Sequence, residues 1–131
     1  MAHDEAMHPP NVGFRRLLWT AAAFNVFGAY VLAFPSHFVG TWLGLPSDVP
    51  AVYRAIVGSF VLLFGGAYAW LAAAKPIDRA MVAFGAIGKA SVFALTVALF
   101  LASATTARMV ALASGDLAFA GLFAWWLRAT R

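Results

Sequence analysis

Long apolar stretches alternate with short polar breaks along this chain. The apolar stretches cover about residues 17–34, 51–74, 79–102 and 107–127. A hydrocarbon core about 30 Å thick is crossed by about 20 apolar helical residues, which matches the length of each stretch. The pattern predicts four transmembrane helices and three connections, with both termini on the same side. Residues 1–13 are polar and are expected to form a flexible N-terminal tail, which leaves residues 14–131 as one helical domain.

The polar breaks contain residues that typically end or begin helices. Pro35 ends the first stretch, because proline lacks the N–H that would continue a helix. Ser47 or Asp48 is the expected N-cap of the second helix, with Pro50 in its first turn. The other two connections are the short segments Lys75–Asp78 and Ser103–Thr106.

The first connection, Pro35–Pro50, is the longest of the three. After Ser36, the expected N-cap, its apolar residues recur at roughly helical spacing: Phe38, Val39, Trp42, Leu43 and Leu45. A short amphipathic helix on the outer membrane interface is expected here. The predicted fold class is therefore all-α: a four-transmembrane-helix antiparallel bundle with a short amphipathic helix in the first outer loop.

The composition excludes several classes of protein. Of the 131 residues, 63% are hydrophobic and 11% are charged, and the mean hydropathy is +0.84. A soluble chain of this size could not bury so large an apolar fraction, and disordered segments have the opposite composition. The chain has no cysteine, which excludes disulfides, thiol nucleophiles and cysteine-ligated metal centres.

Basic residues lie near the ends of the apolar stretches and not on one face, so we expect the lipid bilayer as a partner and no nucleic acid. Six lie on the side of the termini: Arg15, Arg16, Lys75, Arg79, Arg128 and Arg131. Two lie on the other side: Arg54 and Arg108. This bias predicts that the N- and C-termini lie in the cytoplasm. We expect the first helix to be retained, because its apolar core is longer than that of a signal peptide and acidic residues precede it.

Polar residues inside the apolar stretches are the candidate binding residues: Asn25, Arg54, Lys89 and Asp116. Ionisable groups near the bilayer centre cost about 2.5–3.5 kcal/mol each on insertion scales and normally face a bundle interior. Counting about 1.5 Å per residue from the outer helix ends places Asn25, Lys89 and Asp116 within roughly 6 Å of a common depth. Arg54 is expected to snorkel toward the outer interface. We predict an intramembrane polar cluster in which Lys89 pairs with Asp116 and Asn25 is close enough to hydrogen-bond them.

Small residues accompany these polar positions at helical spacing. They follow Arg54 at Gly58, Gly65 and Ala72, and they flank Lys89 at Gly85 and, as a small polar residue, Thr96. Small residues allow helices to approach closely in membranes, so these faces are expected to point inward. The adjacent Gly65 and Gly66 are interpreted as a packing notch or a hinge.

The apolar helices contain no Ser/His/Asp arrangement, carboxylate pair or histidine cluster, so we expect no catalytic residue, no metal and no cofactor. His37 is the single imidazole of the first connection and has no companion ligand in that segment. Two interpretations of Lys89 and Asp116 stay open. They form a salt bridge that only fixes helix register, or a functional site such as a polar-ligand site, a proton relay or a headgroup pocket.

Three short motifs resemble the DoxX-like families and similar small four-helix bacterial membrane proteins. They are Trp42-Leu43-Gly44-Leu45-Pro46 in the first connection, Gly85-x-x-Gly88-Lys89 in the third helix and Gly115-Asp116 in the fourth. The likeness covers most of residues 14–128. It implies four compact transmembrane helices in a bacterial inner membrane, and some members of such families accompany redox or thiol-related systems. Because this chain has no cysteine, the resemblance assigns no catalytic residue.

Three functions are compatible with these features. The first is a non-enzymatic accessory or assembly module, or a binder of a lipid or another hydrophobic compound. The second is a small proton-coupled dimeric exporter, although the family that it would resemble uses an acidic residue where this chain has Asn25. The third is a redox or quinone-associated subunit that uses Lys89 and Asp116. A homo-oligomer or a larger membrane complex stays open in each case.

The charge bias makes a topology prediction. A reporter fused after Arg131 is expected in the cytoplasm, and one inserted at Ser47 is expected outside, because basic flanks are retained on the cytoplasmic side. Paired reporters, one active only in the cytoplasm and one only outside, measure this at each position. An external C-terminal reporter would contradict the prediction.

Overall fold

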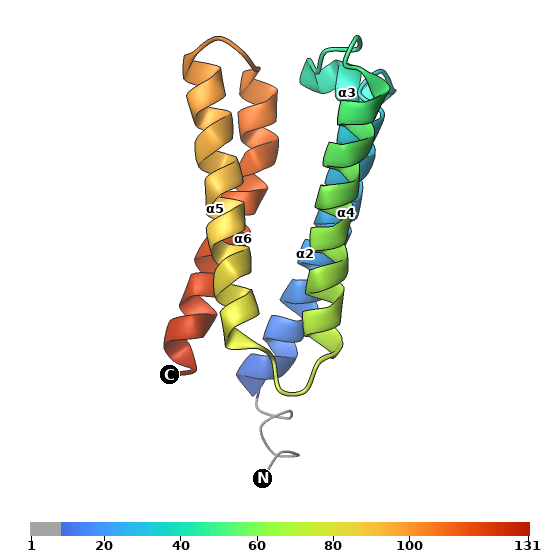
Figure 1. The fold of residues 1–131 in the computed structure, drawn as a ribbon. Helices are drawn as coiled ribbons and strands as arrows, with labels where there is room; N and C mark the ends of the chain where they lie inside the picture. Colours follow the sequence, from blue (N-terminus) through green and yellow to red (C-terminus); the bar gives the residue numbers. More distant parts are fainter. Residues whose placement is uncertain (1–8) are drawn as a thin grey trace. The chain divides into compact units, whose positions relative to one another are not determined.

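A computed structural model describes residues 9–131 of the chain. Within this range the protein is helical and has no β-strand (Figure 1). The helices are α2 (Pro9–Ala33), α3 (Phe38–Leu43), α4 (Ala51–Ala73), α5 (Arg79–Leu101) and α6 (Ala107–Ala129). All except α3 are long and apolar enough to cross a membrane, which is compatible with a small multi-pass membrane protein. The predicted all-α class, with four long apolar helices and a short helix in the first connection, is confirmed.

Helix α2 begins earlier than the sequence predicts. It starts at Pro9, so residues 9–13, which were expected in the flexible tail, are helical. Prolines are tolerated in a first turn because the N–H groups there have no partner within the helix. Residues 1–8, the rest of the predicted tail, lie outside the described residues.

The predicted N-caps of α3 and α4 are wrong by one to three residues. Pro50, and not Ser47 or Asp48, occupies the N-cap of α4, and its carbonyl accepts from the backbone N–H of Tyr53 and Arg54. His37 occupies the N-cap of α3 in place of Ser36. Neither N-cap side chain makes a capping hydrogen bond. Polar side chains further upstream are too distant in sequence to reach the N–H groups of the first turn.

The described chain divides into two compact units, each built on a pair of antiparallel helices. The first hairpin contains α2 and α4, and the second contains α5 and α6 (Figure 1). Helix α3 lies between α2 and α4 in sequence but belongs to the second hairpin. The connection between α4 and α5 includes a cis peptide bond between Lys75 and Pro76.

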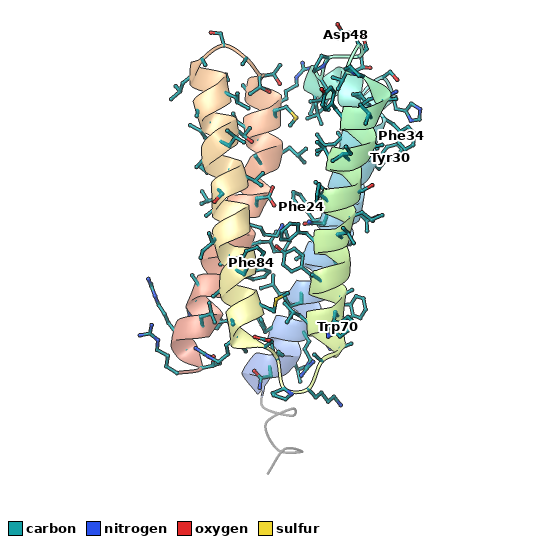
Figure 2. All side chains as sticks on the ribbon, in the orientation of Figure 1. Phe24, Tyr30, Phe34, Asp48, Trp70 and Phe84 are labelled. Carbon is teal, nitrogen blue, oxygen red and sulfur yellow. The ribbon has the colours of Figure 1, made fainter. Side chains whose placement is uncertain are left out.

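Aromatic side chains cover the outside of the first hairpin near the ends of its helices. Tyr30 and Phe34, at one end of α2, are exposed, with ring centroids 5.7 Å apart (Figure 2). Trp70, near the end of α4, is exposed as well (Figure 2). Aromatic rings are enriched at membrane–water interfaces because one part of each ring is apolar and its edge or polar group tolerates water. The outer surface of this hairpin therefore fits a lipid environment.

The predicted small-residue face of α4 packs against α2. A Cβ atom placed on Gly58 would lie 3.0 Å from the Ala33 Cβ, and one placed on Gly65 would lie 3.2 Å from the Ala22 carbonyl oxygen. By contrast, a Cβ on Gly66 would meet nothing within 4 Å. Gly65 is therefore the packing notch, and Gly66 faces outward.

Arginines close both ends of the first hairpin by binding helix C-termini. Arg15, in α2, donates from Nη1 to the carbonyls of Ala72 and Ala74 at the end of α4, at 2.7 and 2.6 Å. Arg54, in the first turn of α4, donates to the carbonyl of Ala33 at the end of α2, at 3.3 Å. The last carbonyls of a helix lack partners and carry a partial negative charge. Each helix of the pair thus supplies the cation that neutralises the end of the other.

At one end of the second hairpin, an arginine likewise binds the C-terminal carbonyls of the neighbouring helix. Arg79, the first residue of α5, donates from Nη2 to the Leu127 carbonyl at 2.6 Å and from Nη1 to the carbonyl and hydroxyl of Thr130. Its guanidinium carbon also lies 5.6 Å from the centre of the Trp126 ring. Trp126 is buried beneath it, whereas Trp125 is exposed. The capping contacts give these arginines a structural role besides their predicted effect on topology.

The Gly65 contact predicts a strong asymmetry between neighbouring substitutions. Gly65→Leu is expected to lower the thermal stability of the detergent-solubilised protein by about 1–3 kcal/mol, because the added side chain would overlap the α2 backbone. Gly66→Leu adds the same side chain on the open face and is the matched control. Equal melting temperatures for the two variants would contradict this packing.

Candidate intramembrane polar site

The centre of the second hairpin contains a buried ion pair. The Nζ atom of Lys89 on α5 lies 2.7 Å from Oδ1 of Asp116 on α6, and the two residues are separated by 27 positions. The Lys89 side chain is 4% exposed and the Asp116 side chain is 16% exposed. The predicted pairing of these two residues is confirmed.

The helix faces explain how the pair is enclosed. On α5, Val82, Gly85 and Lys89 are buried at intervals of three and four residues, which places them on one side of the helix. On α6, the buried residues flanking Asp116 include Ala113 and Ala120. Small neighbours on both helices let the long lysine side chain lie between them and reach the carboxylate.

Phe119 completes the surroundings of the ammonium group. The Lys89 Nζ atom lies 5.0 Å from the centre of the Phe119 ring, within the range of a cation–π contact. Phe119 in turn packs at a tilted angle against Phe123, with centroids 6.3 Å apart. Phe119 is not among the candidate residues predicted from the sequence. Its position three residues after Asp116 is the signal that could have found it, because residues three apart share a helix face.

Only one of the two carboxylate oxygens of Asp116 accepts a hydrogen bond within residues 9–131. Its Oδ1 atom accepts from Lys89, and within residues 9–131 Asp116 makes no other hydrogen bond. The Asp116 side chain is thus more exposed than the nearly buried side chain of Lys89. The Oδ2 atom is therefore a strong hydrogen-bond acceptor at the middle of an apolar helix pair. The Asp116 carboxylate and the Lys89 ammonium together carry no net charge.

Asn25 and Arg54 belong to the first hairpin, where each binds a backbone carbonyl. Asn25 is buried and donates from Nδ2 to the Val61 carbonyl at 3.1 Å. This approach depends on Gly65, because a Cβ there would lie 3.2 Å from the Cβ of Asn25. Arg54 caps α2 through Ala33. That Asn25 and Arg54 share one cluster with Lys89 and Asp116 stays a prediction.

Metal-ligand groups are sparse in the part of the chain that the structure describes. Among residues 9–131, no three His, Cys, Asp or Glu side chains are grouped so that they could hold a metal ion. His37 lies at the start of α3, and His3 and His8 lie outside the described residues. The ion pair is therefore the most distinctive chemical feature of the described helices.

Comparison of the chain with protein families, with curated proteins and with solved structures gave no match. The resemblance to DoxX-like families stays a prediction based on short motifs.

The ion pair predicts a strongly non-additive double-mutant cycle. Asp116→Asn or Lys89→Met alone leaves a buried charge without its partner, which costs about 3–5 kcal/mol in soluble proteins and less where water can penetrate. The double variant is expected to be more stable than the worse single variant. Thr96→Val, which removes a hydroxyl bonded within α5, is the control. Thermal unfolding in detergent measures all four, and single variants as stable as the wild type would contradict the coupling.

Proposed function

We propose that this chain is a non-enzymatic membrane module that binds a lipid or another hydrophobic compound at the Lys89–Asp116 pair. The observation that carries the proposal is the Asp116 carboxylate in the middle of an apolar helix: its side chain is 16% exposed, and only its Oδ1 atom accepts from Lys89 within residues 9–131. The other carboxylate oxygen is a recognition point for a molecule that is already dissolved in the membrane.

The chemistry of this oxygen selects a neutral ligand with a hydrogen-bond donor. Because Lys89 balances the charge of Asp116, a charged ligand would lose its solvation without gaining a counter-ion. An O–H or N–H group would instead gain a hydrogen bond to a charged acceptor, which is stronger than a bond between neutral groups. Long-chain alcohols and lipids with free hydroxyl groups have this combination of properties.

Energetics support a functional interpretation over a purely structural one. In soluble proteins, replacing a buried ion pair with apolar residues of similar volume is often neutral or stabilising. An apolar hairpin therefore has little need of Lys89 and Asp116 for stability alone. A pair that only fixed register would also be satisfied by two fully buried partners, whereas the Asp116 side chain is 16% exposed.

The cellular setting of the proposal follows from the charge pattern and the resemblance. Six basic residues flank one side of the helices and two flank the other, which supports cytoplasmic termini, and the resemblance supports a bacterial inner-membrane location. The DoxX-like resemblance supports an accessory role beside other membrane proteins. A second copy of the chain or a larger membrane complex is its proposed partner.

A pair of photoreactive probes tests the proposal. One is a long-chain alcohol that carries a photoreactive group, and the other is its methyl ether, which lacks the O–H donor. In reconstituted wild-type protein, labelling of α5 and α6 around Lys89 and Asp116 is expected to favour the alcohol by about tenfold, as a hydrogen bond to a charged group implies.

The control variants separate binding from folding. Lys89→Met combined with Asp116→Leu removes the pair without leaving an unpaired charge, and it is expected to abolish the preference for the alcohol. Asp48→Asn removes one negative charge in the first connection and is expected to keep that preference. Equal labelling by alcohol and ether in the wild type would contradict the proposal.

A further inference from the structure

Helix α3 and the start of α6 form a second surface, which exposes both aromatic rings and a cation. The two faces of α3 differ: Gly40 and Leu43 are buried, whereas Phe38 is 84% exposed and Trp42 is 53% exposed. Arg108, in the first turn of α6, is exposed beside them. This surface combines two outward aromatic rings with one cation.

Hydrogen bonds hold α3 in place on α6. The Thr106 hydroxyl donates to the Leu43 carbonyl at 2.5 Å and accepts from the Met109 backbone N–H at 3.3 Å. Gly44 ends α3 with a φ of +78°, and a Cβ at this position would lie 2.5 Å from the Thr106 Cγ2 atom. Only glycine combines this conformation with so close an approach. The short helix is therefore fixed and does not need a ligand to order it.

Arg108 is positioned by the same helix. Its Nη1 atom donates to the Trp42 carbonyl at 2.7 Å, and its guanidinium carbon lies 5.0 Å from the centre of the Trp42 ring. Within residues 9–131, Arg108 makes no further hydrogen bond or ion pair. Its remaining N–H donors are available on a guanidinium that has already lost its conformational freedom, and the planar fork of such donors matches a phosphate group.

Charge complementarity indicates the sign of the partner. In the second hairpin, which comprises residues 36–47 and 79–131, Asp116 is the single acidic residue and it is paired with Lys89. The segments around Arg108, from Ser36 to Ser47 and from Arg79 to Gly115, contain no carboxylate, and Asp48, the acidic residue that follows Ser47, belongs to the first unit. An ammonium-bearing headgroup would find no counter-ion in these segments, whereas a headgroup with a net negative charge would be attracted.

The location of the surface indicates that this partner is a lipid. Arg108 lies at the start of α6, which is long and apolar enough to span a membrane. Helix α3 lies in the connection between the end of α2 and the start of α4, which are also long enough to span it. These positions correspond to the membrane–water interface, where aromatic rings and arginines are favoured. We propose that Arg108 binds the phosphodiester of an anionic phospholipid while Phe38 and Trp42 pack beside its upper acyl chain. The proposal rests on the membrane location but not on ligand binding at Asp116.

Photoreactive phospholipids test this surface directly. Phosphatidylglycerol and phosphatidylcholine, each with a photoreactive group near the headgroup, are compared in vesicles that contain the full-length protein. Adducts on residues 36–47 are expected to favour phosphatidylglycerol by about fivefold, which corresponds to one arginine near the membrane surface. The preference is also expected to fall as salt screens the charge.

Matched variants assign the preference to Arg108. Arg108→Gln is expected to remove it, whereas Arg128→Gln, the same change at the opposite end of α6, is expected to keep it. Helix content by circular dichroism checks that both variants fold. Equal labelling of residues 36–47 by the two lipids in the wild type, or loss of the preference in Arg128→Gln alone, would overturn the proposal. The Lys89→Met/Asp116→Leu variant is expected to keep it, so the outcome is independent of the central site.

Discussion

The ion pair between Lys89 and Asp116 is the charged contact that joins α5 to α6 inside the second hairpin. Arg79 lies ten residues before Lys89, and Leu127 lies eleven residues after Asp116, so the pairing that joins the two charges also brings Arg79 to the end of α6. A shift by one helical turn would separate the ammonium from the carboxylate by about 5 Å and would misplace this contact too. Because the surrounding helix faces are apolar, such a shift would leave both charges without partners, which makes the register cooperative.

The same constraint, that polar groups in an apolar environment must find partners, organises the remaining contacts. Asn25 is satisfied by the Val61 carbonyl, and the close packing at Gly65 makes that bond possible. Arg15 and Arg79 each neutralise the C-terminal carbonyls of the adjacent antiparallel helix. Each of these side chains thus binds acceptors within its own hairpin, although the buried Nε atoms of Arg15 and Arg54 make no hydrogen bond. Asp116 differs in the kind of atom that is left: one of its carboxylate oxygens, an acceptor on a partly exposed side chain, has no partner within residues 9–131, which is why ligand binding is proposed there.

Sequence patterns were sufficient for features that depend on residue type and spacing. The four long helices followed from apolar length, and the Lys89–Asp116 pair followed from opposite charges at matched depth on consecutive helices. Contacts with backbone carbonyls could not be predicted, because a carbonyl acceptor such as that of Ala33 is not encoded by its side chain. The N-cap of α4 was misplaced for a related reason: a capping-type residue was present upstream, but the helix begins where Pro50 sets the backbone.

Solid-state NMR of the protein in lipid bilayers can measure the central contact directly. The chain contains two lysines, Lys75 and Lys89, so a Lys75→Arg variant with ¹⁵N-labelled lysine and ¹³C-labelled aspartate reports on Lys89 alone. We expect a strong dipolar coupling between the Lys89 Nζ and an aspartate Cγ, and we expect Asp116→Asn with unlabelled asparagine to abolish it. No measurable coupling in the variant that retains Asp116 would contradict the buried ion pair, and with it the register and the proposed binding site.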